Sequence, residues 1–275
     1  MRVSFEFFPP KTDKGLTSLL QRAQVLKKTA PEFFSVTYGA GGSTREGTRQ
    51  VVAQLSSNTG VNSAPHLSMG DDSEETLHSL LDTYKANNVT RIVALKGDVP
   101  SGMGVRNSRG RNAETLVRLI RQHSGDFFHL EVAAYPEVHP DAKSPEADLA
   151  FFQRKVEAGA NSAITQYFYN SHAYFDFANR CQQRGITIPI FPGIMPITNF
   201  EGLLRFSKAC GADLPRWITK QLEAYQDDKP SLAKFGLEVV TKLCDELMNG
   251  GAPGLHFYTL NQAEPALAIW QNLNS

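Results

Sequence analysis

Eight short apolar segments, rich in β-branched and aromatic residues, recur along the chain and alternate with longer amphipathic stretches. Segments of this length and composition are typical of β-strands. We predict strands over residues 3–8, 33–37, 61–67, 91–95, 127–134, 162–167, 186–191 and 254–258. Until the last interval they begin roughly 30 residues apart, which is the size of a strand–helix–strand unit.

The stretches between these segments carry apolar residues at steps of three and four, the pattern of a helix with one buried face. We predict helices over residues 16–26, 76–84, 113–120, 147–156 and 232–247. Ser73, followed by two glutamates, fits a helix N-cap with acids in the first turn. A further helical excursion around residues 203–228 lengthens the last interval.

This alternation predicts parallel strands, because parallel neighbours need a long crossover connection. Eight such units in 275 residues favour an α/β fold of the closed (β/α)8 type, a TIM barrel, over an open sheet. No G-x-G-x-x-G follows a predicted strand, so a Rossmann domain lacks its fingerprint. We expect a single catalytic barrel domain over residues 1–275, with the extra helical excursion before the last strand.

The charge balance and the cysteines exclude several classes of function. Lys and Arg number 28, as do Asp and Glu, so neither a nucleic acid nor a membrane surface is indicated as a partner. Cys181, Cys210 and Cys244 show no C-x-x-C spacing, which argues against a disulfide framework. No apolar run approaches the roughly 18–20 residues of a membrane span, and no secretory signal is recognisable at the N-terminus. We expect a cytoplasmic protein.

The ends of the predicted strands form the candidate site, because TIM-barrel active sites lie at the C-terminal ends of the strands. The residues there are Glu6, Thr37, Tyr38, His66, Gly97, Asp98, Tyr135, Pro136, Glu137, Gln166, Pro192, Gly193 and residues 258–261. Polar residues also border strands in ordinary loops, so each position alone fits a structural role as well.

Glu6 is the most informative of these positions, since it lies between Phe5 and Phe7 in an apolar strand. Charged residues are rarely buried without compensation. One interpretation is that the apolar neighbours raise the pKa of the Glu6 carboxyl and make it a proton donor near neutral pH. The other is a structural ion pair with a buried Arg or Lys.

Three further motifs have both a functional and a structural interpretation. Residues 37–44, TYGAGGST, form a glycine-rich turn whose backbone N–H groups fit an anion or a closely approaching cofactor. Asp98 is placed either to tune an electron-accepting ring or to cap a helix. Residues 166–170, QYFYN, fit stacking on a flat heterocycle and core packing equally well.

Metal and covalent chemistry find little support in the sequence. His66, His139 and His256 invite a zinc hypothesis, but no H-E-x-x-H or equivalent pair accompanies them, so we predict no metal site. No G-x-S-x-G elbow is found either, which argues against a serine nucleophile.

Taken together, the motifs FEFFPPK, FFSVTYGAGGSTREGT, PHLS, ALKGD, AAYPEVHP, KVEAGANSAITQYFY, PGIMPI and LHFYTLN resemble the flavin-dependent methylenetetrahydrofolate reductases. They occur in order from Ser4 to Asn261, and the length resembles the bacterial form. The resemblance implies a (β/α)8 barrel with non-covalent FAD at the strand ends. It also implies that NADH or NADPH reduces the flavin, which then reduces 5,10-methylenetetrahydrofolate to 5-methyltetrahydrofolate for methionine synthesis. Self-association into a homo-oligomer is common in the family.

The resemblance also assigns roles residue by residue. Glu6 matches the general acid that protonates the bridging amine of the folate, and Asp98 matches the acid beside the flavin pyrimidine. Matches to FAD contacts are Thr37, Tyr38, Ala40, His66, Lys96, Gly97, Asp98, Ala113, Tyr135, His139, Ala142, Asp148, Arg154 and Lys155, the last two toward the diphosphate or adenosine. Gln166 matches a residue that binds folate and nicotinamide, Thr37 also faces substrate, and Phe206 matches an aromatic on a covering loop.

Four positions depart from the bacterial pattern: Asn112, Phe151, Gly202 and Gln262. Gln262 replaces an arginine, a planar donor suited to a carboxylate or phosphate. These departures leave open an altered folate or nicotinamide partner, or a diverged paralogue. Two other classes also stay open, a pterin-binding methyltransferase barrel without flavin and a non-catalytic binding barrel.

Overall fold

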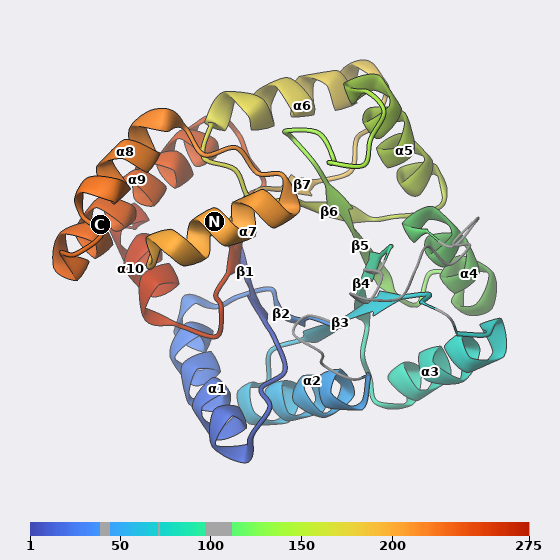
Figure 1. The fold of residues 1–275 in the computed structure, drawn as a ribbon. Coiled ribbons are helices and arrows are strands. Elements are labelled where there is room, and N and C mark those ends of the chain that lie inside the picture. Colours follow the sequence, from blue (N-terminus) through green and yellow to red (C-terminus); the bar gives the residue numbers. More distant parts are fainter. Residues whose placement is uncertain (39–44, 71, 97–111, 275) are drawn as a thin grey trace.

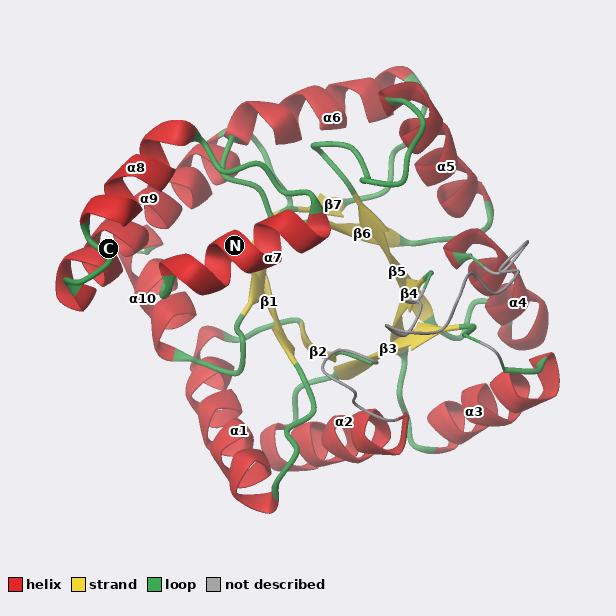
Figure 2. Cartoon of the chain, viewed as in Figure 1, coloured by secondary structure: helices red, strands yellow, loops and turns green. Residues whose placement is uncertain are grey.

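The computed structural model describes residues 1–38, 45–70, 72–96 and 112–274. Nine parallel strands form one nearly closed barrel with helices packed around the outside (Figure 1, Figure 2), which confirms the predicted TIM barrel. The strands are β1 (Arg2–Phe7), β2 (Phe33–Val36), β3 (Ser63–Ser68), β4 (Arg91–Leu95), β5 (His129–Ala134), β6 (Ser162–Thr165), β7 (Ile190–Phe191), β8 (Gly193–Ile194) and β9 (Gly254–Tyr258).

Eight of the nine strands correspond to the predicted ones, although only residues 190–191 of the predicted seventh strand form β7, and β8 at residues 193–194 was not predicted. Pro192 separates β7 from β8 because proline has no backbone N–H to donate to a neighbouring strand. Its carbonyl oxygen still accepts the His256 N–H at 3.0 Å. β7 pairs with β6 and β8 pairs with β9, so the two short strands together join the ends of the sheet.

Ten α-helices lie in the described part of the chain. They are α1 (Asp13–Leu26), α2 (Arg45–Thr59), α3 (Glu74–Ala86), α4 (Ala113–Ser124), α5 (Pro145–Glu157), α6 (Ser171–Gln183), α7 (Phe200–Cys210), α8 (Arg216–Ala224), α9 (Lys229–Asn249) and α10 (Glu264–Leu273). The predicted excursion is α7 and α8, and Ser73 caps α3 by accepting the Thr76 N–H. In the described residues, none of the helices is both long and apolar enough to cross a membrane.

Alternation along β1 separates two cores. Val3, Phe5 and Phe7 belong to the large layer between the sheet and the helices, where Phe5 stacks on Phe257 with ring centroids 5.6 Å apart. Ser4 and Glu6 take the other face, because successive strand residues point to opposite sides. A smaller cluster of Phe33, Ala64, Val93 and Ile164 fills the barrel interior.

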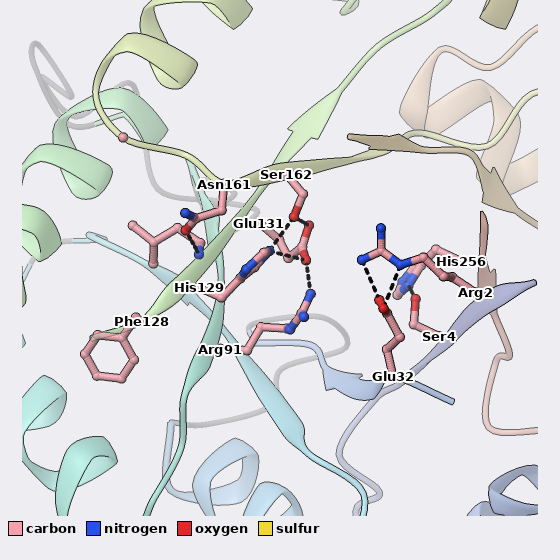
Figure 3. A network of polar contacts seen from close by, with 12 residues as sticks. Arg2, Ser4, Glu32, Arg91, Phe128, His129, Glu131, Asn161, Ser162 and His256 are labelled. Carbon is pink, nitrogen blue, oxygen red and sulfur yellow. Dashed lines mark hydrogen bonds and ion pairs between the residues drawn. The ribbon is translucent and has the colours of Figure 1, made fainter. Parts of the chain in front are cut away.

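A polar network surrounds the buried Glu131 near the beginnings of β4, β5 and β6 (Figure 3). Arg91 forms an ion pair with its carboxylate, and Ser162 Oγ donates a hydrogen bond of 2.6 Å. Burial raises the pKa of Glu131, but His129, Arg91 and Ser162 outweigh burial and lower it. Because this is the end of the barrel opposite the strand C-termini, the network supports stability rather than chemistry.

Candidate active site

Glu6 lies in the barrel interior at the C-terminal end of β1 and faces two histidines. Its Oε2 is 3.3 Å from His66 Nε2 on β3 and 3.8 Å from His256 Nε2 on β9. The Glu6 side chain is 18% exposed, His66 is 8% exposed and His256 is fully buried. The end of β1 is fixed from outside this cluster, since Asn261 exchanges two hydrogen bonds with the Phe8 backbone, at 2.9 and 2.8 Å.

These neighbours lower the pKa of Glu6, whereas the sequence predicted a raised pKa. Burial raises the pKa of Glu6, but the neighbouring imidazoles of His66 and His256 outweigh burial and lower it to about 2. The prediction of a raised pKa was wrong because Phe5 and Phe7 point away from the carboxyl, into the outer core. Among the described residues, the partners of Glu6 are histidines and not the Arg or Lys of the predicted alternative.

His256 beside Glu6 is a site residue that the motif comparison did not assign. The signal was nevertheless in the strand periodicity. β1 and β9 pair in parallel with Ser4 opposite His256 and Glu6 opposite Tyr258. Since inward residues alternate, an inward Glu6 places Ser4, His256 and Tyr258 on the same interior face.

Two predicted flavin contacts end in buried polar atoms without a hydrogen-bond partner among the described residues. They are Thr37 Oγ1, just after β2, and His66 Nε2 on the neighbouring β3. Buried polar atoms in native proteins are usually satisfied, so an unsatisfied pair at a barrel mouth fits a polar ligand. Tyr38 follows Thr37 and is partly buried.

The loop between β5 and α5, together with the first turn of α5, holds four more of the predicted flavin contacts together. The rings of Tyr135 and His139 are 4.5 Å apart, and Asp148 accepts the His139 N–H at 2.9 Å. The Ala142 N–H donates to the His139 carbonyl at 2.8 Å. Lys96, at the end of β4, joins this loop through an ion pair of 3.3 Å with Asp141. The structure therefore brings these residues together as one preformed loop.

Arg154 and Lys155 do not form the paired cationic surface that the resemblance implies. Arg154 is half exposed and contacts Glu114 of α4, with Nε 3.0 Å from Oε2. Lys155 is only 4% exposed, and its Nζ donates to the Ala133 carbonyl inside the β5–α5 layer. Burial lowers the pKa of Lys155 to about 8. Ala113 is buried at the start of α4. Asn112, one of the four positions that depart from the bacterial pattern, is the N-cap of this helix.

One of the predicted substrate residues, Gln166, lies in a small cleft at the ends of β5 and β6. Gln166 lines it with Tyr135, Glu137 and Tyr167, and the end of α7 closes the other side. Burial raises the pKa of Glu137 to about 7, although this carboxyl also accepts the Asp213 N–H at 2.9 Å. Phe206 is 42% exposed and lies within helix α7, not in a loop as predicted. α7 is tied to the barrel by a 3.0 Å hydrogen bond between Tyr167 and Ser207.

Three predicted site residues, Ala40, Gly97 and Asp98, lie outside the described residues. Among the residues that the structure does describe, no three His, Cys, Asp or Glu side chains are arranged to hold a metal ion. Gly202 is in the first turn of α7, where its N–H donates to Asn199 Oδ1 at 2.6 Å.

Comparison with known proteins decides the family. The sequence model of methylenetetrahydrofolate reductase matches residues 1–274. The chain belongs to the methylenetetrahydrofolate reductase family. It is 37% identical over 273 residues to the 5,10-methylenetetrahydrofolate reductase of Escherichia coli, a match that covers 99% of this chain and 90% of that protein.

The family also includes longer relatives. A probable methylenetetrahydrofolate reductase (NADH) from rice is 40% identical over 282 residues, covering 98% of this chain but 48% of the rice protein. The chain thus spans about half the length of that plant relative. Among solved structures, an uncharacterized Clostridium thermocellum protein that binds two copies of 5-methyl-5,6,7,8-tetrahydrofolic acid superposes with a TM-score of 0.66 at 15% identity. It covers 99% of this chain and 94% of its own, and at this identity the likeness concerns the fold.

Proposed function

We propose that this enzyme reduces 5,10-methylenetetrahydrofolate to 5-methyltetrahydrofolate, using FAD and either NADH or NADPH in two successive half-reactions that supply methionine synthesis. The observation that carries the proposal is Glu6, a carboxyl at the barrel mouth with His66 and His256 at 3.3 and 3.8 Å. Family membership over residues 1–274 names the folate as the expected substrate.

The described residues fit a flavin. Thr37 Oγ1 is a buried polar atom without a hydrogen-bond partner among the described residues, and His66 Nε2 makes no hydrogen bond there either, although it faces Glu6 Oε2 at 3.3 Å. Tyr38, Lys96, Ala113, Tyr135, His139, Ala142, Asp148 and Arg154 complete the described set that we assign to it, while Ala40, Gly97 and Asp98 keep their assignment from the resemblance. The chemistry that a bound FAD would supply here is hydride transfer between the reduced nicotinamide and the folate. Lys155 supports the site indirectly, because its buried ammonium donates a hydrogen bond to the Ala133 carbonyl on β5.

Glu6 supplies the proton in this proposal. The bridging methylene accepts a hydride only after the five-membered ring opens to an iminium ion, and opening requires a proton on the bridging amine. In the free site Glu6 is ionised, because its two imidazole neighbours lower the pKa to about 2. A bound folate would cover the exposed 18% of this side chain, and this further burial would favour uptake of a proton from solvent by Glu6, which then passes that proton to the bridging amine. Gln166 and Phe206 are the proposed substrate contacts.

The test is Glu6→Gln, followed by anaerobic stopped-flow absorbance of the flavin. Reduced nicotinamide should still bleach the flavin at the normal rate, because that step needs no proton from Glu6. Reoxidation by methylenetetrahydrofolate should slow by about 10²–10⁴-fold, the usual contribution of a positioned acid. Glu32→Gln is the matched control, since Glu32 pairs with Arg2 at the opposite end of β1. Normal reoxidation in Glu6→Gln would refute the role of Glu6, and wild-type protein without bound flavin would refute the proposed function.

The proposal extends to the setting in which the enzyme works. We assign residues 1–275 to a single catalytic barrel domain, since all nine strands belong to one sheet. The free Cys181, Cys210 and Cys244 support a reducing compartment, and we assign the enzyme to the cytoplasm. Self-association is expected from the family and is tested by light scattering.

A further inference from the structure

Ser4 and His256 form a buried polar pair next to Glu6 on the interior face of the barrel. Ser4 Oγ and His256 Nδ1 are 2.7 Å apart (Figure 3). Ser4 is 3% exposed and His256 is fully buried. The other ring nitrogen, Nε2, has no hydrogen-bond partner among the described residues and faces Glu6 Oε2 at 3.8 Å. This gap is longer than a hydrogen bond, and catalytic contacts of this kind often tighten when a substrate binds.

The chemistry of a neutral imidazole links these two contacts. One ring nitrogen carries a proton and donates, while the other accepts. If the Ser4 hydroxyl donates to Nδ1, then Nε2 carries the proton and presents a donor to an ionised Glu6. If Nδ1 carries the proton and donates to Ser4, then Nε2 becomes an acceptor for a protonated Glu6. A hydroxyl serves both cases, because it is at once a donor and an acceptor.

Of the groups around His256, Ser4 is the one placed to determine which ring nitrogen carries the proton. On β2, Phe33 stacks against the ring with centroids 5.9 Å apart, and the Arg91 guanidinium from β4 lies 4.3 Å from the same Phe33 ring. On β9, Tyr258 packs edge-on at 5.4 Å, but its hydroxyl donates to the Thr165 carbonyl at 2.7 Å. His66 on β3 faces the same Glu6 oxygen. Among the described residues, Ser4 therefore supplies the hydroxyl that lies within hydrogen-bond distance of the His256 ring.

We infer that the Ser4–His256 pair is a positioning unit that lets Glu6 alternate between carboxylate and carboxylic acid during folate reduction. When Glu6 gives up its proton, the Nε2–H tautomer holds the carboxylate. When Glu6 takes up a proton from solvent on its other carboxyl oxygen, Oε2 can still accept from the same Nε2–H, so His256 keeps one tautomer throughout. In both states Ser4 donates to Nδ1, and Nε2–H has Glu6 Oε2 as its acceptor once the 3.8 Å gap closes, which avoids the cost of an unsatisfied polar group. The inference rests on the proposed role of Glu6 as the proton donor.

The experiment compares Ser4→Ala with Ser4→Thr in the flavin-loaded enzyme over pH 5 to 9. Removing the hydroxyl should slow folate-dependent flavin reoxidation by about tenfold and shift its pH profile, because a buried hydrogen bond that orients the acid is lost. Ser4→Thr keeps the hydroxyl and should recover most of that rate. Flavin reduction by the nicotinamide should stay within twofold in both. The control is Ser63→Ala, a buried strand serine whose hydroxyl contacts the Val61 carbonyl instead.

A second readout does not depend on turnover. Nitrogen-15 NMR of histidine-labelled protein at pH 7 should show the Nε2–H tautomer of His256 in wild type and a mixture of tautomers in Ser4→Ala. An Nδ1–H tautomer or a doubly protonated ring in wild type at pH 7 would overturn the inference, as would an unchanged pH profile in Ser4→Ala. If wild-type flavin is not reoxidised by the folate, the proposed function fails instead, and the NMR result still reports on Ser4 and His256.

Discussion

Replacing Lys155 with methionine tests whether this lysine supports the barrel or contacts the cofactor. Its ammonium is buried against the Ala133 carbonyl and lies 5.2 Å from the Phe151 ring centroid. Burial lowers the pKa of Lys155 from 10.5 to about 8, and Asp148 offsets only part of that shift. At 1.36 kcal/mol per pKa unit, the folded protein disfavours the charged lysine by about 3 kcal/mol.

The sign of the pH dependence follows from the two proton affinities. Between pH 8 and 10.5 the unfolded chain keeps the Lys155 proton while the folded protein releases it, so the free energy of unfolding rises with pH in that range. Relative to Lys155→Met, wild type should therefore gain about 3 kcal/mol between pH 7 and pH 10.5. At pH 7, Lys155→Met removes the penalty of about 3 kcal/mol for burying the charged lysine. It also removes a hydrogen bond, worth about 1.5–3 kcal/mol for a charged donor, so the two effects on the free energy of unfolding nearly cancel.

Equilibrium urea unfolding followed by circular dichroism measures this difference. Lys234→Met, at an exposed position of α9, is the control and should differ from wild type by a constant amount across pH. A constant difference for Lys155→Met as well would refute the buried ammonium. Flavin affinity should change less than twofold in Lys155→Met. A loss of more than tenfold with unchanged stability would instead place Lys155 at the cofactor.

Two further substitutions test the barrel that carries the site. Arg91→Ala leaves the fully buried Glu131 without its cation and should lower the free energy of unfolding by about 3–5 kcal/mol in urea titrations, and a loss under 1 kcal/mol would contradict the network. Gly193→Ala places a Cβ against the Thr165 carbonyl and 2.6 Å from a ring carbon of Tyr258, so it should cost about 1–3 kcal/mol. An unchanged melting temperature in Gly193→Ala would show that Tyr258 moves freely aside.

The regular elements followed from local pattern, and the exceptions have local causes. β4 and β9 have the predicted bounds because each short apolar run is bordered by polar or glycine positions. Helices α2 and α10 were not predicted, and neither was α6. Its buried residues Ser171, Tyr174, Phe177 and Cys181 recur at steps of three and four, but two of them are polar or weakly apolar and break the hydrophobic pattern. Pro192 separates β7 from β8, and the two strands together join the ends of the sheet.

The environment of Glu6 could be predicted only in part. The sequence identified Glu6 as an unusual carboxyl and, by its motifs, as a general-acid candidate. It suggested apolar surroundings because Phe5 and Phe7 are its neighbours in the chain. In a strand those neighbours point to the opposite face, so the side chains around Glu6 come from other strands.

By itself, the sequence determined the barrel and the strand ends at which polar residues collect, because both follow from periodicities over a few residues. Only the tertiary structure decided that His66 and His256 face Glu6 and that Ser4 holds His256. Ser4 and His256 are 252 positions apart, and their contact exists because closing the barrel pairs β1 with β9 in a register that sets them opposite each other. The acidity of Glu6 depends on charges a few ångströms away in space. Those distances are fixed by strand pairing between distant parts of the chain, and no local pattern contains them.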